Sequence, residues 1–472
     1  MSKLIVVSNR TPAKSPAAGG LAVALQAALA DREGFWFGWS GEFITKPTKD
    51  IAFHDVGDIK VGSIGLTKHD FNAYYAGYSN RILWPSFHLR LDLAHFDNSW
   101  YEGYRSVNAQ FAAALMPHLE PDDTIWVHDY HLIPLAEELR RLGAENRIGY
   151  YLHIPFPTPD ALFAVPHHEE LLHDLSRYDL IGLQANRDVA ALREAIDHAV
   201  PPAFGGATRR PADFSKTRIA AFPIGSDPEA FAKLATGAAA NKMANRLRTS
   251  LRGNDLIMGV DRLDYSKGLP QRLEAYEKLL GYNANLRRKV HMLQVAPPSR
   301  DMISEYRDTS DTVDAICGRV MGRFSEPDWQ PLTYVKRPYG QASLAGIYRL
   351  AKVGLVTPLR DGMNLVGHEY VAAQDPEDPG VLVLSRFAGA AEIFADAIQV
   401  NPFDTDETAE AMRVALEMSL DERKARWQSL FAAATKHNIH SWGTDYIQAL
   451  MEREERGTSE DESPHKDRKI AS

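Results

Sequence analysis

Short apolar stretches alternate with amphipathic stretches along almost all of this 472-residue chain, and this alternation constrains the fold more than any other feature. Most of the apolar stretches lack a strict polar–apolar alternation, which is typical of parallel strands covered by helices on both faces. The pattern therefore indicates an α/β fold with doubly wound parallel sheets. We predict strands at residues 4–8, 124–128, 147–154, 180–184, 218–225, 256–263, 290–296, 353–358, 380–385 and 397–402.

The alternation is interrupted once, by a strand-free stretch at residues 223–247. A chain of this length exceeds what one hydrophobic core supports, so two domains are expected. We predict one Rossmann-like domain over residues 1–227 and a second over 228–455, facing each other across a cleft where ligands meet the carboxyl ends of the strands. Residues 456–472 are polar and of mixed charge, which predicts a disordered tail.

Composition excludes several classes of protein. The net charge is −9, with 53 Lys and Arg against 62 Asp and Glu, which argues against non-specific binding to nucleic acid. Cys317 is the single cysteine, so no internal disulfide can form; we interpret it as a core residue in a reducing cytoplasm. No apolar run approaches the roughly 20 residues of a membrane span, and the N-terminus lacks the features of a signal peptide. We expect a cytoplasmic protein.

Several common motifs are absent or misleading. The first strand is not followed by G-x-G-x-x-G, which disfavours a nicotinamide enzyme, and neither a Walker motif nor G-x-S-x-G is present. The histidines of "HEELLH" (residues 168–173) are five apart rather than four, so we predict an exposed polar helix instead of a zinc site. In "DTDET" we expect Asp404 or Thr405 to cap a helix. We predict no metal site.

Two cations, Arg262 and Lys267, stand at the end of the predicted strand 256–263. Gly268 follows them and would let the backbone approach a ligand before the next helix begins. This is where a phosphate meets side-chain cations and a helix N-terminus. The alternative is local ion pairing with Asp261 and Asp264, and the residues alone leave both interpretations open.

A second polar cluster, "TPLRDGMNLVGHEY" at residues 357–370, separates a strand from a helix. Free N–H groups at residues 364–366 would bind an anion. Glu369 lies near one turn further on, where a carboxylate could accept hydrogen bonds from the vicinal hydroxyls of a ribose. The alternatives are a helix cap for Asp361 and a solvated helix face for Glu369; strand, polar cluster and helix together favour a ligand site.

Two further groups of residues lie near strand ends. His153 and Asp129 follow apolar strands, and prolines after His153 predict a rigid loop, although a lone histidine is more often a core residue. The second group combines aromatic faces, which pack on sugars, with arginines at separate strand ends, which could hold another phosphate. Its alternative is core aromatics with surface arginines. This group includes Arg10, Trp39, Tyr75, Trp84 and Arg300.

The motifs in order closely resemble the trehalose-6-phosphate synthase family of retaining glycosyltransferases, whose members have two Rossmann-like domains (the GT-B fold). The resemblance runs from Ser8 to Gln374 and includes two long, specific motifs, "RLDYSKGL" and "LRDGMNLV". It implies transfer of glucose from UDP-glucose to glucose-6-phosphate, giving α,α-trehalose-6-phosphate. The other matching motifs are "SNR", "GGLAV", "FGWSGE", "LWPSFHLR", "HDYHL", "HIPFPTP", "APPSR" and "EYVAAQ".

The resemblance also implies roles for individual residues. The catalytic residues would be Arg262 and Lys267 on the donor diphosphate, with His153 and Asp361 on the donor glucose. The other donor-site residues would be Gly19, Gly20, Tyr339, Asn364, Leu365, Val366, Gly367, His368 and Glu369. The acceptor site would comprise Arg10, Trp39, Tyr75, Trp84, Asp129 and Arg300.

The reaction implied by the resemblance needs no metal or other cofactor, because cations and helix N–H groups would stabilise the leaving diphosphate. It further implies a homo-oligomer, with a separate phosphatase acting on the product. Two alternatives stay open: a synthase that uses glycerol-3-phosphate as acceptor, and an inactive homologue that senses sugar phosphates. The aromatic group at Trp39, Tyr75 and Trp84 favours a glucose-sized acceptor, and the intact cluster of Arg262, Lys267, Asp361 and Glu369 disfavours an inactive protein.

Overall fold

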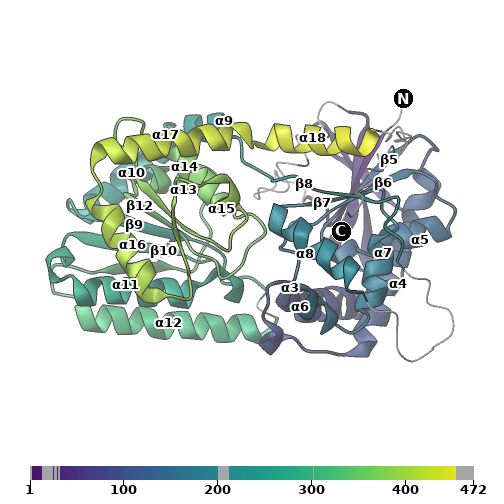
Figure 1. Ribbon diagram of the computed structural model, residues 1–472, viewed down its shortest axis with the longest axis horizontal. Coiled ribbons are helices and arrows are strands. Elements are labelled where there is room, and N and C mark those ends of the chain that lie inside the picture. The colour runs from purple at the N-terminus through teal and green to yellow at the C-terminus, as the bar shows by residue number, and fades with distance from the viewer. Residues whose placement is uncertain are drawn as a thin grey trace, which may run out of the picture.

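The computed structural model describes residues 3–12, 25, 29, 32–199, 212–300 and 302–452. Two sheets stand side by side, each with helices packed around it (Figure 1). The first has the order β3-β4-β2-β1-β5-β6-β7-β8, and the second β11-β10-β9-β12-β13-β14. Every strand pair is parallel except β3–β4, so the predicted α/β fold with doubly wound sheets is confirmed.

The strands of the first sheet are β1 (Leu4–Arg10), β2 (Gly34–Phe43), β3 (Ala52–Val56), β4 (Ile59–Leu66), β5 (Thr124–His128), β6 (Arg147–Tyr151), β7 (Leu180–Leu183) and β8 (Arg218–Ala221). Those of the second sheet are β9 (Asp255–Val260), β10 (Val290–Val295), β11 (Leu332–Val335), β12 (Val353–Val356), β13 (Val381–Ser385) and β14 (Ile398–Val400). All ten predicted strands are present. The sequence pattern did not predict β2, β3, β4 and β11, which contain glycine, are largely exposed or are short.

The helices around the first sheet are α2 (Lys68–Phe71), the π-helix η1 (Asn72–Leu83), α3 (Trp84–Phe87), α4 (Asn98–Leu115), α5 (Leu135–Arg141), α6 (Pro159–Phe163), α7 (His168–Leu175) and α8 (Asn186–Asp197). Those of the second half are α9 (Pro228–Ala235), α10 (Ala238–Leu251), α11 (Leu269–Tyr282), α12 (Ser304–Phe324), α13 (Gln341–Leu350), α14 (Leu365–Ala373), α15 (Ala390–Ile393), α16 (Thr405–Glu417), α17 (Leu420–Lys436) and α18 (Ile439–Met451). Short 3-10 turns are η2 (Leu91–Leu93), η3 (Met116–His118), η4 (Tyr130–Leu132), η5 (Tyr265–Lys267) and η6 (Ala284–Leu286).

The last helix, α18, runs back from the second half of the molecule and packs on β6 and β7 of the first sheet (Figure 1). The Tyr446 ring stacks on Trp126 at 4.6 Å between centroids, and its hydroxyl donates to the Tyr150 carbonyl at 3.0 Å. The two halves are therefore joined twice along the chain, near α9 and again through α18. The domain boundaries at 227 and 455 stay predictions, and residues 456–472 lie outside the described part of the chain.

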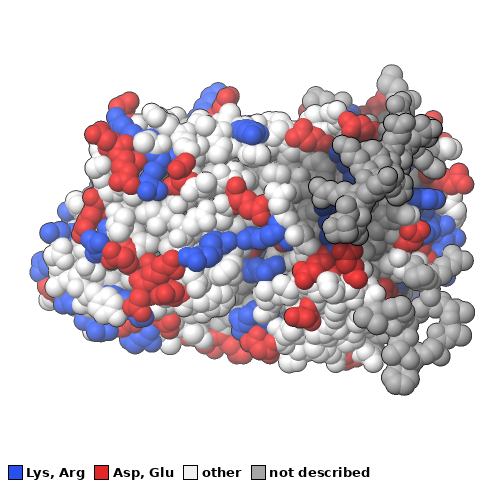
Figure 2. Space-filling view, viewed as in Figure 1, with Lys and Arg blue, Asp and Glu red and all other residues white. Residues whose placement is uncertain are grey.

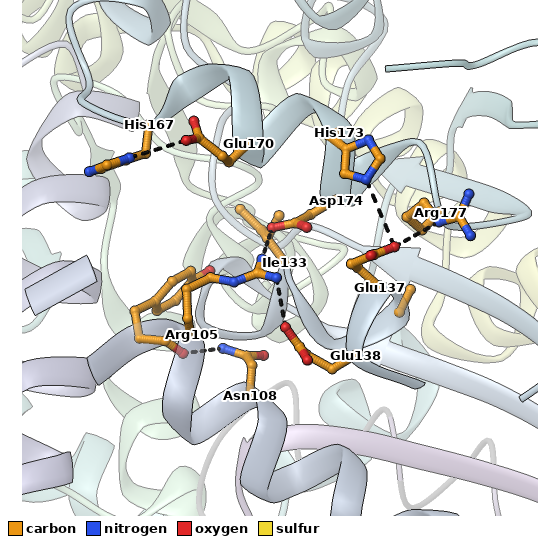
Figure 3. A network of polar contacts seen from close by, with 12 residues as sticks. Arg105, Asn108, Ile133, Glu137, Glu138, His167, Glu170, His173, Asp174 and Arg177 are labelled. Carbon is orange, nitrogen blue, oxygen red and sulfur yellow. Dashed lines mark hydrogen bonds and ion pairs between the residues drawn. The ribbon is translucent and has the colours of Figure 1, made fainter. Parts of the chain in front are cut away.

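The helix at "HEELLH" is not the exposed polar helix that we expected. Asp174 of α7 is buried and pairs with Arg105 of α4, whose other nitrogen lies 2.6 Å from Glu138 of α5 (Figure 3). Burial raises the pKa of the Asp174 carboxyl to about 7, against the opposing charge of Arg105. The helix is amphipathic, because Leu171, Leu172 and Leu175 are buried together with Asp174, which joins α7 to α4 and α5 through this ionic network.

Three other expectations concern single features. Asp404 caps α16 by accepting hydrogen bonds from the N–H groups of Asp406 and Glu407, as predicted. Cys317 is buried in α12, which confirms the core interpretation. Acidic and basic side chains are interspersed on the face seen in Figure 2. Within the described ranges, no helix is long and apolar enough to span a membrane, and no three potential metal-binding side chains gather.

Candidate active site

A cavity of about 490 Å³ lies between the two halves, at the carboxyl ends of strands from both sheets. It brings together nine of the predicted site residues: His153, Arg262, Lys267, Tyr339, Asp361, Asn364, Leu365, Val366 and Glu369. His153 comes from the first sheet, and the other eight come from the second half. This is the position that ligands of open parallel sheets occupy.

Arg262 lines this cavity and, after Arg300, is one of the charges that lower the pKa of the Asp264 carboxyl against its burial. The buried Asp261 beside it pairs instead with Arg272 of α11 at 2.7 Å. Asp264 caps Ser266 at 3.0 Å and lies 3.6 Å from Arg300. Among the described residues, Arg262 forms no ion pair and donates only to the Ser299 hydroxyl, at 3.4 Å. Among the described residues no direct ion pair joins Arg262 to either neighbouring aspartate, so its guanidinium is available to an anion.

Lys267 is held in place rather than free. Its Nζ lies 2.5 Å from Oδ2 of Asp361, and the same oxygen accepts a hydrogen bond from Asn364 Nδ2 at 3.0 Å. Both charged side chains are 13% exposed, so the ammonium still reaches the cavity. Asp361 therefore does not cap α14 as in the alternative interpretation. Asp361 instead fixes the position of Lys267 at the cavity that Arg262 also lines.

The N-terminus of α14 opens onto the cavity because of Asn364. This residue has φ 76° and ψ 87°, a left-handed conformation that asparagine tolerates better than most residues. Its side chain accepts from the N–H of Val366 at 3.2 Å and caps the helix. Gly268 also has a positive φ, 65°, and a Cβ there would lie 2.4 Å from the Thr357 carbonyl. Glycine is therefore needed at this position for a structural reason, because its backbone lies close to Thr357, the residue that follows β12.

Glu369 faces the cavity from the second turn of α14, where it accepts a hydrogen bond from Tyr348 at 3.3 Å. Burial raises the pKa of its carboxyl to about 7, and the Tyr348 bond lowers it only in part. It is therefore not on a solvated helix face. Gly367 and His368 do not line the cavity: His368 is fully buried with its ring 4.6 Å from Phe394.

On the other side of the cavity, His153 follows β6. Burial lowers the pKa of its imidazole to about 3, so the ring is neutral near pH 7. Its Nε2 lies 3.0 Å from Nδ1 of His128, the last residue of β5. The backbone N–H of His153 donates to Asp129 at 3.2 Å. His153 lines the cavity, and its other ring nitrogen, Nδ1, takes no part in these contacts.

A second cavity, of about 480 Å³, lies in the first half of the molecule. Three predicted residues line it: Arg10, Trp39 and Tyr75. The Arg10 guanidinium carbon lies 5.5 Å from the centre of the Trp39 ring, and the Tyr75 ring stacks on Phe71 at 5.1 Å. The other lining residues were not predicted from the sequence; they are Asn9, Phe43, Lys68, Phe71, Asn72 and Met302. The cavity thus combines aromatic walls with two cations, Arg10 and Lys68.

Arg300, Trp84 and Asp129 line neither of these two cavities. The Arg300 guanidinium lies over the Trp84 ring at 3.8 Å and donates to the Tyr130 hydroxyl at 3.1 Å. Asp129 has φ 75° and ψ 164°, which is rare outside glycine and is often found at functional sites. Burial raises the pKa of its carboxyl to about 6, against hydrogen bonds from the His153 and Tyr130 N–H groups. Gly19 and Gly20 lie outside the described residues.

Some of the missed residues left a signal in the sequence. Gln184, which lines the first cavity, is the last residue of the predicted strand 180–184 and directly follows β7, so the same strand-end rule could have found it. Lys68 follows β4, so missing that strand concealed it. Tyr348 lies inside α13, and no local pattern marks it.

Comparison with known proteins gives consistent matches over nearly the whole chain. A family model described as glycosyltransferase family 20 matches residues 4–452. A trehalose-6-phosphate synthase from Sinorhizobium fredii (strain NBRC 101917 / NGR234) is 46% identical over 463 residues, which cover 97% of this chain and 100% of that protein.

Two solved structures share the fold. An alpha,alpha-trehalose-phosphate synthase (UDP-forming) from Burkholderia xenovorans, in complex with glucose-6-phosphate, is 45% identical with a TM-score of 0.89, over 95% of this chain and 100% of that one. A structure described as trehalose-6-phosphate from E. coli bound with UDP-2-fluoro glucose is 44% identical, also with a TM-score of 0.89, over 95% of this chain and 99% of that one.

Proposed function

The chain belongs to glycosyltransferase family 20, and from this premise we infer that it transfers glucose from UDP-glucose to glucose-6-phosphate, giving trehalose-6-phosphate and UDP. The observation that carries the inference is that two cations line one cavity between two parallel sheets. Arg262 forms no ion pair among the described residues, and Lys267 is held in place by Asp361. A relative bound to glucose-6-phosphate and another bound to a UDP-sugar support the choice of substrates.

For the donor, we propose that Arg262 and Lys267 bind the diphosphate of UDP-glucose and that the N-terminus of α14 adds N–H groups. Preorganised cations stabilise the charge that develops on a leaving diphosphate, so they lower the barrier more than they tighten binding of the substrate. Glu369 would accept hydrogen bonds from the ribose hydroxyls, with Tyr339 at the nucleotide. His153 and Asp361 would contact the glucose. Support for these assignments comes from the cavity that these residues share.

For the acceptor, we propose that the second cavity holds glucose-6-phosphate. Its aromatic side chains suit the C–H faces of a sugar, and its cations suit a phosphate. Arg10 was expected from the sequence, and Lys68 is the additional cation. Within the described part of the chain neither forms an ion pair, so both charges are available.

The step we propose retains the anomeric configuration. The bond between the glucose C1 and the β-phosphate oxygen breaks, and C1 bonds to the acceptor hydroxyl oxygen on the same face, while the departing phosphate oxygen takes the hydroxyl proton. The three carboxylates that line the donor cavity have other partners: Asp261 pairs with Arg272, Asp361 with Lys267, and Glu369 accepts from Tyr348. This favours a front-face transfer over a carboxylate nucleophile.

The direct test is to incubate purified protein with glucose-6-phosphate and each of UDP-, GDP- and ADP-glucose, and to identify the product by mass spectrometry and NMR. We expect a phosphorylated disaccharide with UDP-glucose. Glycerol-3-phosphate in a parallel assay tests the alternative acceptor. The absence of any disaccharide phosphate with all three donors would overturn the proposal. A homo-oligomer is a separate proposal, testable by light scattering.

Replacing Lys68 with alanine should weaken use of the acceptor phosphate. We expect kcat/KM for glucose-6-phosphate to fall about tenfold, which corresponds to about 1.4 kcal/mol for one exposed charged contact. Activity with unphosphorylated glucose should not change, because that substrate lacks the group Lys68 would bind. Lys49→Ala, at an exposed lysine away from both cavities, is the control. An equal loss with both acceptors would exclude a contact to the phosphate.

Glu369 should make donor binding depend on pH. Its pKa of about 7 means that the carboxyl gains a proton as the pH falls below 7, and a protonated carboxyl accepts ribose hydrogen bonds poorly. Affinity for UDP-glucose, which has no group titrating between pH 5 and 8, should therefore fall by up to about tenfold per pH unit below 7. Calorimetry across this range measures it.

The matched variant is Glu369→Gln, which should bind UDP-glucose more weakly at pH 8 and with a flatter pH profile. The same steep profile in the variant would show that another group titrates. The raised pKa has the opposite consequence for stability: from 4.5 to about 7 the folded chain holds a proton that the unfolded chain releases, so this group destabilises the fold as pH rises through that window.

A further inference from the structure

His128 and His153 form a pair of histidines behind the donor cavity. His128 is the last residue of β5, and His153 follows the adjacent strand β6. Nδ1 of His128 lies 3.0 Å from Nε2 of His153, within hydrogen-bonding distance. The backbone fixes both residues, because the N–H of Asp129 donates to the Tyr151 carbonyl at 2.8 Å and Asp129 in turn accepts from the N–H of His153 at 3.2 Å.

Both rings are neutral near pH 7. Burial lowers the pKa of His153 to about 3 and lowers that of His128 well below its usual range, with the His153 charge as a second cause. A neutral imidazole carries one N–H and one lone pair. A hydrogen bond between two such rings needs the N–H of one and the lone pair of the other. The tautomer of His128 therefore determines the tautomer of His153.

His128 has no other polar function. It is fully buried, and its ring lies 4.5 Å from Trp126, 6.2 Å from Tyr151 and 6.3 Å from Trp442 of α18. Its Nε2 is buried without a hydrogen-bond partner among the described residues. Of these two histidines, only His153 is among the described residues that line the donor cavity. Three aromatic rings thus surround the His128 side chain, whose one polar contact among the described residues is another histidine.

We propose that His128 is a positioning residue that holds His153 in a single tautomer and ring orientation toward the donor cavity. The inference rests on the proposed function, in which His153 contacts the donor glucose. With Nε2 engaged by His128, Nδ1 of His153 is the atom that would meet a sugar hydroxyl, and its role as donor or acceptor is coupled to the tautomer of His128 before the substrate binds. Preorganisation of this kind removes reorganisation from the catalytic step.

Nitrogen-15 NMR of protein labelled at histidine tests the tautomer directly. Two-bond correlations distinguish the protonated from the unprotonated ring nitrogen, and a His153→Asn variant assigns the His153 signals. We expect His153 to show one tautomer across pH 6–8, with one nitrogen fully protonated. Averaged shifts for the two nitrogens in the wild-type chain would overturn the proposal, whatever any variant does.

The variant that removes the contact is His128→Phe, which keeps an aromatic ring in the same packing. We expect turnover to fall about 10- to 100-fold, while the KM for glucose-6-phosphate stays within about twofold of the wild-type value. In the NMR spectrum of this variant, the shifts of the two His153 ring nitrogens should be averaged. Trp442→Phe is the matched control, because it disturbs the same aromatic packing and leaves the histidine pair intact.

A comparable loss of turnover in both variants, or an unchanged His153 tautomer in His128→Phe, would overturn the proposal. If His128→Phe does not fold, the wild-type spectrum still decides. Failure of the wild-type chain to make a disaccharide phosphate would contradict the proposed function instead, and the spectrum separates that outcome from failure of the histidine proposal.

Discussion

Alanine in place of Arg262 is expected to lower turnover by about 100- to 1,000-fold, the usual cost of removing a preorganised group that stabilises transition-state charge. Arg262 faces the cavity without a carboxylate partner in the described chain, so its full charge is available to a diphosphate. Because that charge grows as the bond to glucose breaks, kcat should fall more than the affinity for UDP-glucose. Steady-state kinetics and calorimetry measure the two quantities separately.

Two further variants sharpen this test. Arg262→Lys keeps the charge but loses the planar fork that fits two phosphate oxygens, so it should retain intermediate turnover. Arg246→Ala removes an exposed arginine of α10 that lies away from both cavities, and its activity should be that of wild type. If Arg262→Ala turned over at the rate of Arg246→Ala, the proposed diphosphate contact would be wrong.

Much of the fold could be predicted because buried parallel strands leave continuous apolar runs, as in β5 and β9. The strands that were missed are those without such runs: β2 carries Gly, Ser and Glu among its aromatics, and most of β3 is exposed. Tertiary pairing, rather than local pattern, makes them strands, since β2 lies between β1 and β4. Local sequence does not report that context.

The donor site was more predictable than the acceptor site for a physical reason. Arg262, Lys267 and Asp361 stand at strand ends, and the carboxyl ends of parallel strands meet at one edge of the sheet. What the sequence could not decide was how charges pair. Asp261 is next to Arg262 in the chain, but its carboxylate pairs with Arg272 in the first turn of α11. Only the three-dimensional arrangement shows that Arg262 forms no ion pair with any other residue of the described ranges.

The two halves of the molecule are in contact on more than one side of the donor cavity. Glu392 accepts from the N–H groups of Asn186 and Arg187 at the start of α8, at 2.9 and 3.2 Å. Arg360 donates to the Phe156 carbonyl at 2.7 Å, and His95 lies 2.6 Å from Glu305. These contacts bring strand ends from both sheets to the same cavity. Gly362 of the second half also lies against the backbone of His153 in the first half.

Replacing Gly362 with alanine is expected to reduce turnover about 100-fold by forcing the two halves apart. A Cβ at this position would lie 2.1 Å from the carbonyl oxygen of His153, far inside contact distance. The segment cannot move away, because its other side is fixed: Asp361 N–H donates to the Phe387 carbonyl at 3.2 Å, and Met363 accepts from Ala390 at 3.0 Å. A displacement of about 1 Å between reacting groups costs about 100-fold in rate.

The same substitution should also cost about 1–3 kcal/mol of stability, the usual range for overpacking a filled site. The control is Gly318→Ala in α12, where an added Cβ would have no neighbour within 4 Å. There the exchange should stabilise the helix by up to about 1 kcal/mol and leave turnover unchanged. Kinetics and thermal unfolding of both variants measure these effects. Wild-type turnover in Gly362→Ala would mean that His153 and Asp361 need not approach this closely during transfer, because the backbone contact between the halves would then be dispensable.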